Sequence, residues 1–179
     1  MVPLTIVKTE RQTNKQWYII HLADRLKRGE HYQVDIKFSG ALLTNSKDGF
    51  FIDSYVDKDS GEKRIFVATQ LRPNFARRLF PCFDEPAFKV PIELSIAHTS
   101  NVSSLSNMPI KTTEQSPTEP GWVWDHFQRS LPMSTFSLSI VISDLPFIHP
   151  KPAEGNEKGK RCYSVIYERN FITITSMTS

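Results

Sequence analysis

The sequence predicts an all-β fold: an antiparallel saddle-like or sandwich sheet domain with one short helix. Three segments alternate apolar and polar residues without a break. Such alternation is typical of strands with one buried face, because successive side chains point to opposite sides of a sheet. Turn-forming stretches separate the segments. The composition, 39% hydrophobic and 23% charged over 179 residues, is that of a globular protein large enough to bury a core.

The first half of the chain contains three predicted strands. Residues 4–7 and 17–22 are short candidates, rich in β-branched and aromatic residues. Residues 32–39 alternate fully, with Tyr, Val, Ile and Phe on one face, and predict a half-buried strand. Polar and glycine-containing stretches at residues 45–49 and 57–61 predict turns.

The next elements lie between residues 65 and 97. Residues 65–69 predict a strand, and residues 73–80 predict the single short helix, which Pro73 starts and Pro81 ends. Residues 90–97 alternate fully, and Pro91 places this strand at an edge or makes the proline one of its first residues.

The last elements of the predicted sheet follow a polar stretch, residues 112–120, that predicts a turn. Residues 121–127 are a further aromatic-rich strand candidate, and residues 136–143 alternate fully. Together these segments give about seven strands, which predicts an antiparallel sandwich or saddle.

The domain is expected to span residues 1–146, because the character of the chain changes after Pro146. Residues 147–179 form a divergent tail in which prolines and glycines interrupt a charged stretch. Within this tail, residues 171–175 predict one further strand.

Charge and hydropathy exclude some classes of partner. The net charge is +3, but Lys and Arg are scattered, and the dense basic run at residues 158–161 lies in the tail, so nucleic acid is not expected as a partner. No stretch approaches the roughly 20 apolar residues that span a bilayer, and the first residues lack the pattern of a secretory signal. A glycosylation sequon at Asn101 is weak evidence for secretion.

Zinc chemistry is not visible in the sequence. Zinc peptidases commonly place two histidines four residues apart on a helix, with a glutamate beside them. No two histidines here have that spacing, and none is followed by Glu; they are His21, His31, His98, His126 and His149.

The other reactive residues have structural explanations that are favoured over catalytic ones. Cys82 and Cys162 are consistent with one disulfide, but two free thiols are the preferred interpretation, and Cys82 is expected in the core. Asp84 and Glu85 are neighbours before Pro86, and a charged turn is favoured over an acid/base pair.

Arginines and tryptophans supply two further candidate clusters. An ion-pair network with the Asp84 turn and a solvated charged face are equally plausible for four arginines, namely Arg64, Arg72, Arg77 and Arg78. Trp122 and Trp124 share a strand face with His126, for which core packing is favoured over an aromatic platform for a ligand.

One long motif resembles a known family. Residues 67–89, VATQLRPNFARRLFPCFDEPAFK, resemble the most recognisable stretch in the first domain of the aminopeptidase N family of zinc metallopeptidases. Further landmarks of that family follow or precede in the expected order, at residues 49–55, 105–109, 124–127 and 132–136. The resemblance runs from about residue 4 to residue 145.

The resemblance implies an all-β saddle as the first domain of an enzyme that removes N-terminal residues from peptides. In this family a thermolysin-like domain follows, with the zinc and a Gly-x-Met-x-Asn segment, and neither pattern occurs in this sequence. The chain also begins partway through the family's first domain. It is therefore expected to be incomplete at its start, to hold no zinc or other cofactor itself, and not to be catalytic alone.

One residue is carried over from the family motif, and a second residue departs from it. Gln70 matches a glutamine that reaches into the active-site cleft, where a carboxamide offers both donors and an acceptor to a peptide. Arg72 stands where members of the family usually have Glu or Gln. A cationic, donor-only guanidinium would repel the amino terminus of a substrate, so Arg72 departs from ordinary aminopeptidase recognition. Local hydrogen bonding at a strand end is the alternative for Gln70.

Three functions remain open at this stage. The chain is a wall of an aminopeptidase's substrate cleft that needs a catalytic domain, a non-enzymatic module that binds a peptide or protein, or a truncated product without function. The spelling of the Pro81–Asp84 stretch resembles the membrane-anchored and secreted branch of the family. Localisation therefore leans towards the cell exterior by resemblance alone.

Overall fold

A computed structural model describes residues 3–57 and 60–144 of the chain. These residues form an all-β structure, as predicted, with eleven strands and two short 3-10 turns. The helix expected over residues 73–80 is only the turn η1 (Ala76–Arg78). The helical conformation is limited to this one turn, and it ends before Pro81, as proline disrupts the interior of a helix.

The described residues fall into two compact units, residues 3–34 and 35–144. The first unit is a hairpin of β1 (Ile6–Gln12) and β2 (Trp17–Leu22), as the sequence predicts for residues 17–22. Ile6, Val7, Trp17 and Tyr18 of this hairpin are exposed. The predicted end of the domain at residue 146 lies outside the described residues and stays a prediction.

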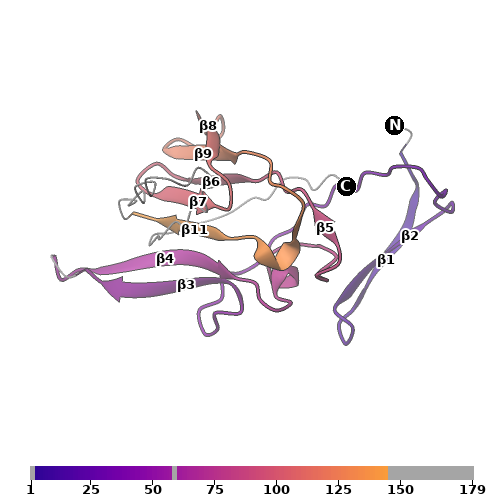
Figure 1. Ribbon diagram of the computed structural model, residues 1–179, viewed down its shortest axis with the longest axis horizontal. Coiled ribbons are helices and arrows are strands. Elements are labelled where there is room, and N and C mark those ends of the chain that lie inside the picture. Colours follow the sequence, from indigo (N-terminus) through magenta and orange to yellow (C-terminus); the bar gives the residue numbers. More distant parts are fainter. Residues whose placement is uncertain (1–2, 58–59, 145–179) are drawn as a thin grey trace, which may run out of the picture. The chain divides into compact units, whose positions relative to one another are not determined.

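The second unit contains two main antiparallel sheets, whose strands are labelled in Figure 1. The first has the order β3-β4-β11-β7, and the second has the order β6-β9-β8. A two-stranded ladder of β5 (Lys89–Val90) and β10 (Met133–Ser134) accompanies them. The bounds of the other strands are β3 Gly49–Val56, β4 Lys63–Gln70, β6 Ser95–Thr99, β7 Ser103–Ser106, β8 Ile110–Gln115, β9 Trp122–Phe127 and β11 Ile140–Ser143.

One hydrophobic core joins these sheets, which is the arrangement of a sandwich. Val67 of β4 and Ile140 and Ile142 of β11 are almost completely buried, and so is Ile96 of β6 in the other sheet. Phe127 of β9 belongs to the same core. The alternation in residues 90–97 and 136–143 therefore predicted the buried faces, although only part of each segment is in a ladder.

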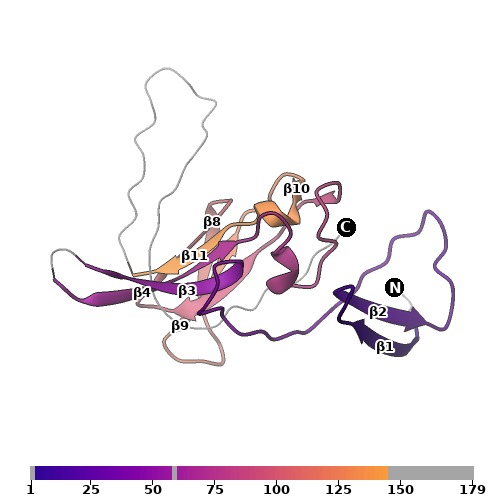
Figure 2. The ribbon, with the colours of Figure 1, turned by 90° about the horizontal axis from the view of Figure 1, so that it is seen from below.

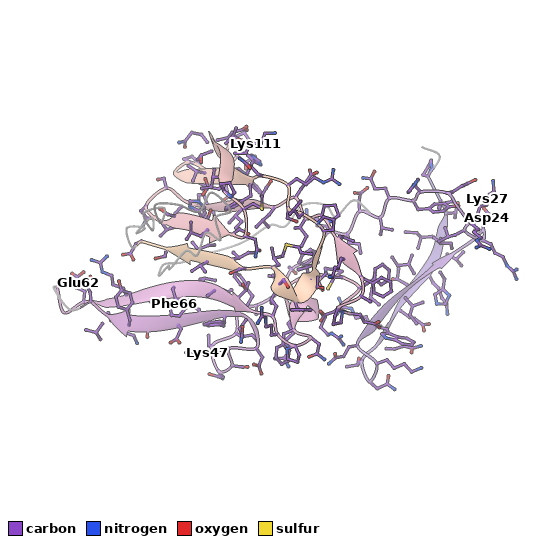
Figure 3. All side chains as sticks on the ribbon, viewed as in Figure 1. Asp24, Lys27, Lys47, Glu62, Phe66 and Lys111 are labelled. Atoms are coloured by element: carbon purple, nitrogen blue, oxygen red, sulfur yellow. The ribbon has the colours of Figure 1, made fainter. Side chains whose placement is uncertain are left out.

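The hairpin of β3 and β4 has the turn that its sequence predicts. Asp57 accepts a hydrogen bond from the backbone amide of Ser60 (3.0 Å) and another, at its carbonyl, from Gly61 (2.9 Å). Gly61 has φ +70°, which favours glycine. Glu62 lies beside this turn, and Lys47 lies in the loop before β3 (Figure 3).

The strand predicted over residues 32–39 is wrong. These residues belong to no strand in the structure, and the apolar side chains of Val34, Ile36 and Phe38 are exposed rather than half-buried. Alternation creates an apolar face, but a strand also needs a neighbour that satisfies its backbone groups. Among the described residues, only the bridge of Leu43 with Phe51 attaches this region to a sheet.

The pattern of alternation also missed four strands, namely β3, β7, β8 and the two-residue β10. β3 and β7 lacked a clear period, and β8 occupies part of the polar stretch at residues 112–120 that was interpreted as a turn. All six residues of β8 are exposed, because β8 is an edge strand of its sheet. Lys111 of this strand is labelled in Figure 3. An exposed edge strand needs no buried apolar face, so its sequence carries no hydrophobic signal.

The core predicts a large difference between two isoleucine truncations. Ile140→Ala is expected to lower the free energy of unfolding by about 3 kcal/mol, because the side chain is fully buried between two neighbouring strands. Ile110→Ala on the exposed edge strand is expected to cost less than about 1 kcal/mol. Urea unfolding followed by circular dichroism measures both. Equal losses in the two variants would contradict this description of the core.

Candidate functional site

Gln70 is the last residue of β4, and its side chain is exposed. It pairs with Gly49 of β3, so both residues face the same side of the sheet. Gly49 has φ +131°, and a Cβ atom at this position would lie 3.1 Å from the Cβ of Arg78. Glycine therefore allows Arg78 to pack over the backbone beside Gln70. The next residue, Leu71, is buried in the core and anchors the end of the strand.

Arg72 lies immediately after this anchor and is exposed. Its guanidinium carbon is 6.0 Å from the centre of the Phe136 ring, and that of Arg78 is 4.6 Å from the centre of the Phe75 ring. At such distances the negative face of an aromatic ring attracts a cation. Within the described residues, no carboxylate lies within ion-pair distance of Arg72 or Arg78. One nitrogen of Arg78 donates to the carbonyl of Asp48 (2.9 Å).

Asp84 braces the loop that carries these arginines. It accepts hydrogen bonds from the Arg77 side chain (2.8 Å) and backbone (3.2 Å), and from the Thr135 hydroxyl (3.3 Å). Its side chain is only 3% exposed, whereas Glu85 is exposed. These contacts link η1 to η2 (Thr135–Ser137), which lie at the same end of the sheet in Figures 1 and 2. The geometry supports a structural turn rather than an acid/base pair.

The four arginines do not form one network with this turn. Arg77 alone among them pairs with Asp84, while Arg64 pairs with Asp57 (3.4 Å) and Asp144 at the other end of β4. Arg72 and Arg78 lie against aromatic rings instead. The two alternatives left open by the sequence therefore apply to different arginines.

Cys82 is half-buried and packs against the hydrophobic core, as expected. Burial, assisted by the negative charge of Asp84, raises the pKa of this thiol to about 12. A thiol with such a pKa is almost entirely protonated at neutral pH, which disfavours a nucleophilic role. Cys162 lies outside the described residues, so the state of the pair stays a prediction.

The tryptophans of β9 are not core residues, and the preferred interpretation of them was wrong. Trp122 and Trp124 are half-buried on the outer face of the sheet, because the alternate residues Val123 and Phe127 face the core. Trp124 and His126 stack with ring centres 6.4 Å apart. The alternative interpretation, an aromatic platform for a ligand, stays a hypothesis.

A buried polar cluster around Asp125 was not predicted. Asp125 of β9 lies 2.7 Å from His98 Nε2 of β6 and accepts hydrogen bonds from Ser104 of β7 (2.5 Å) and Thr113 of β8 (2.6 Å). His98 and Asp125 are 3% and 4% exposed. The sequence held one signal: both residues occupy inward positions in alternating strands whose other inward residues are apolar.

Hydrogen bonding determines the charges in this cluster. The two ring nitrogens of His98 face acceptors, the Asp125 carboxylate and the Thr99 carbonyl (2.9 Å), and this arrangement favours the imidazolium form, in which both nitrogens donate. Burial alone would lower the pKa of His98, but these hydrogen bonds outweigh it and raise the pKa. Burial alone would raise the pKa of Asp125, but its three side-chain donors hold that pKa below the usual range.

This Ser, His and Asp combination is not arranged for nucleophilic catalysis. Ser104 donates its proton to Asp125 rather than to His98, so no base is placed to activate the hydroxyl. Ser104 is also fully buried, away from any substrate. The cluster instead connects strands of both main sheets.

Zinc has no evident site in the part of the chain that the structure describes. No three side chains of His, Cys, Asp or Glu come together there in a way that would hold a metal ion. The family's zinc therefore does not fit the described residues. Among the described residues, no helix is long and apolar enough to cross a membrane.

The chain is similar to several known peptidases. The profile of the peptidase M1 N-terminal domain matches residues 2–137. The thyrotropin-releasing hormone-degrading ectoenzyme of Rattus norvegicus is 40% identical over 132 residues, which cover 74% of this chain and 12% of the relative. Aminopeptidase Q of Mus musculus is 36% identical over 74% of this chain and 24% of its own length. Aminopeptidase N of Rattus norvegicus is 31% identical over 78% of this chain and 14% of its own length.

The Asp125 cluster predicts how stability depends on pH. The raised pKa of His98 means that its contribution is complete below the unfolded value near 6.5 and is lost as the pH rises through the folded pKa. The lowered pKa of Asp125 means that its contribution is complete above about 3.8 and is lost as the pH falls through the folded pKa. The pair therefore stabilises the fold fully between these values.

His98→Gln is expected to cost about 3 kcal/mol at pH 5.5, since it leaves a buried carboxylate without its cation. It should also remove the decrease in stability that the raised pKa of His98 predicts for the native chain as the pH rises above about 6.5. Urea unfolding from pH 5 to pH 9 measures both effects, and His126→Gln on the outer face is the matched control. A native-like alkaline decrease in His98→Gln would show that His98 is not the charged partner.

Proposed function

Because the chain belongs to the peptidase M1 family through its N-terminal domain, we propose that it forms one wall of the substrate cleft of an aminopeptidase. The matched family is the one that the motif at residues 67–89 resembles. The chain spans only 12% to 24% of the length of the relatives described above. The activity itself, removal of N-terminal residues from peptides, is thus proposed for an assembly of this wall with a zinc-bearing catalytic domain. The chain alone is proposed to be inactive.

The placement of Gln70 is the observation that carries this proposal. Its carboxamide is exposed at the end of a strand whose neighbouring residue, Leu71, is 2% exposed in the core. A side chain on such an anchored strand end is pre-positioned, and its amide can donate to and accept from a peptide backbone. The loop that follows is held by Asp84, so the wall beside Gln70 is also rigid.

A non-enzymatic peptide-binding module is the second candidate, and Arg72 favours it. The guanidinium is exposed and cationic where members of the family usually carry an acceptor for the amino terminus of a substrate. Like charges repel, so Arg72 weakens the case for ordinary N-terminal recognition. The same wall would then bind peptides in another way.

A chimera tests the role of Gln70. Residues 2–137 of this chain replace the matched segment of rat aminopeptidase N, and hydrolysis of aminoacyl-amide reporters is measured. Gln70→Ala is expected to raise KM about fivefold with little change in kcat, since it removes a neutral hydrogen bond to bound substrate. Arg72→Glu is expected to lower KM, because it replaces a repulsive charge with an attractive one.

Gln115→Ala is the matched control for this experiment. Gln115 is the last residue of β8 and is exposed, like Gln70, but it lies in the other main sheet. An active chimera in which Gln70→Ala and Gln115→Ala have the same KM would contradict the proposed wall. In that case the non-enzymatic candidate would be preferred.

A further inference from the structure

Within residues 3–57 and 60–144, two arginines near Gln70 have no carboxylate partner, unlike Arg77, which lies between them in sequence. Arg77 donates to Asp84 through its side chain and its backbone. Arg72 and Arg78 have no carboxylate within ion-pair distance in the described parts of the chain. Both are exposed, so their charge is directed to the solvent rather than to the fold.

Each of these two guanidinium groups lies over an aromatic ring. Phe136 lies beneath Arg72 and Phe75 lies beneath Arg78, with distances of 6.0 and 4.6 Å from the guanidinium carbon to the ring centre. A guanidinium that contacts a ring through its face keeps its N–H groups, which lie in its plane, available for a second partner. The rings thereby reduce the side-chain entropy that is lost on binding.

The nearby carboxylates do not compete for these arginines. Both oxygens of Asp84 already accept hydrogen bonds, from Arg77 and from Thr135. Asp48 contacts Arg78 only through its backbone carbonyl, to which one guanidinium nitrogen donates (2.9 Å). Arg78 also packs over Gly49, on the side of the sheet that Gln70 faces. A carboxamide and two cations thus lie around the end of β4.

We infer that Gln70, Arg72 and Arg78 form a binding surface for a peptide with acidic side chains. Gln70 would hydrogen-bond the peptide backbone, and the two guanidinium groups would bind Asp or Glu carboxylates. The choice of a peptide rests on the proposed function. The choice of acidic side chains follows from the two guanidinium groups that have no carboxylate within ion-pair distance among the described residues.

The chemistry of arginine favours this ligand. A guanidinium presents a planar fork of N–H donors that matches a carboxylate, and such charge-assisted bonds are stronger than neutral ones. Because the surface is exposed, water and salt screen the attraction, and the affinity is expected to be modest and to fall as salt is added. The surface therefore discriminates between peptides by charge.

The test uses the complete 179-residue chain and its arginine side-chain Nε–H signals in two-dimensional NMR. The probes are acetyl-Ala-Glu-Glu-Ala-amide and the matched acetyl-Ala-Gln-Gln-Ala-amide, which differ only in charged carboxylates. The acidic peptide is expected to shift the Arg72 and Arg78 signals, and Arg72→Gln or Arg78→Gln is expected to weaken its binding about fivefold. The glutamine-containing peptide is expected to bind the native chain more weakly than the acidic peptide does, by at least a similar factor.

Arg129→Gln is the matched control. Arg129 follows β9 in the sequence and is an exposed arginine, but it pairs with the carboxylate of Glu93 (3.4 Å). Equal binding of the two peptides, or an equal loss in Arg129→Gln, would overturn the inference. So would equal shifts with acetyl-Ala-Gln-Gln-Ala that has a free C-terminal carboxylate, since the surface would then not select side chains. The readout is binding, so an active chimera in which Gln70→Ala leaves KM unchanged contradicts the proposed function alone and leaves this inference standing.

Discussion

The buried carboxylate of Asp125 is the contact on which the larger unit of this fold depends. It joins β9 to β6 through His98, to β8 through Thr113 and to β7 through Ser104. β7 belongs to the four-stranded sheet and the other three strands form the second sheet, so one side chain connects both layers. A buried charge is costly unless its partners are all present, which restricts the strands to a single arrangement.

The position of Gln70 follows from this connection through the order of the strands. β7 pairs with β11, β11 pairs with β4, and Gln70 ends β4. Asp84 then holds the loop after β4 against Thr135, so the loop with Arg72 is fixed at both ends. Gln70 and Arg72 are exposed, and the residue between them, Leu71, is buried in the core. This is the property that a wall of a binding cleft requires.

Much of this fold is predictable from its sequence because burial leaves a periodic pattern. The inward series that contains Ile96 and Ile140 was predicted from alternation, and both side chains are fully buried. The same rule failed for residues 32–39, whose exposed segment has no ladder, and for β8, whose edge position removes the apolar face. The Asp125 cluster depends on four strands that are distant in sequence, which no local pattern reveals. The motif resemblance predicted the family and singled out Gln70, but only the structure shows which arginines have no carboxylate within ion-pair distance among the residues it describes.

We propose that this chain is a folded wall of a substrate cleft and has no catalytic activity of its own. The most direct measurement is hydrolysis of aminoacyl-amide reporters by the purified chain, with and without added zinc, on a sample whose thermal melt is recorded in parallel. The account predicts a cooperative melt and no zinc-dependent turnover. Turnover at enzyme-like rates that requires zinc and disappears when the chain unfolds would contradict it, because residues assigned here to the fold would then be assembling a metal site.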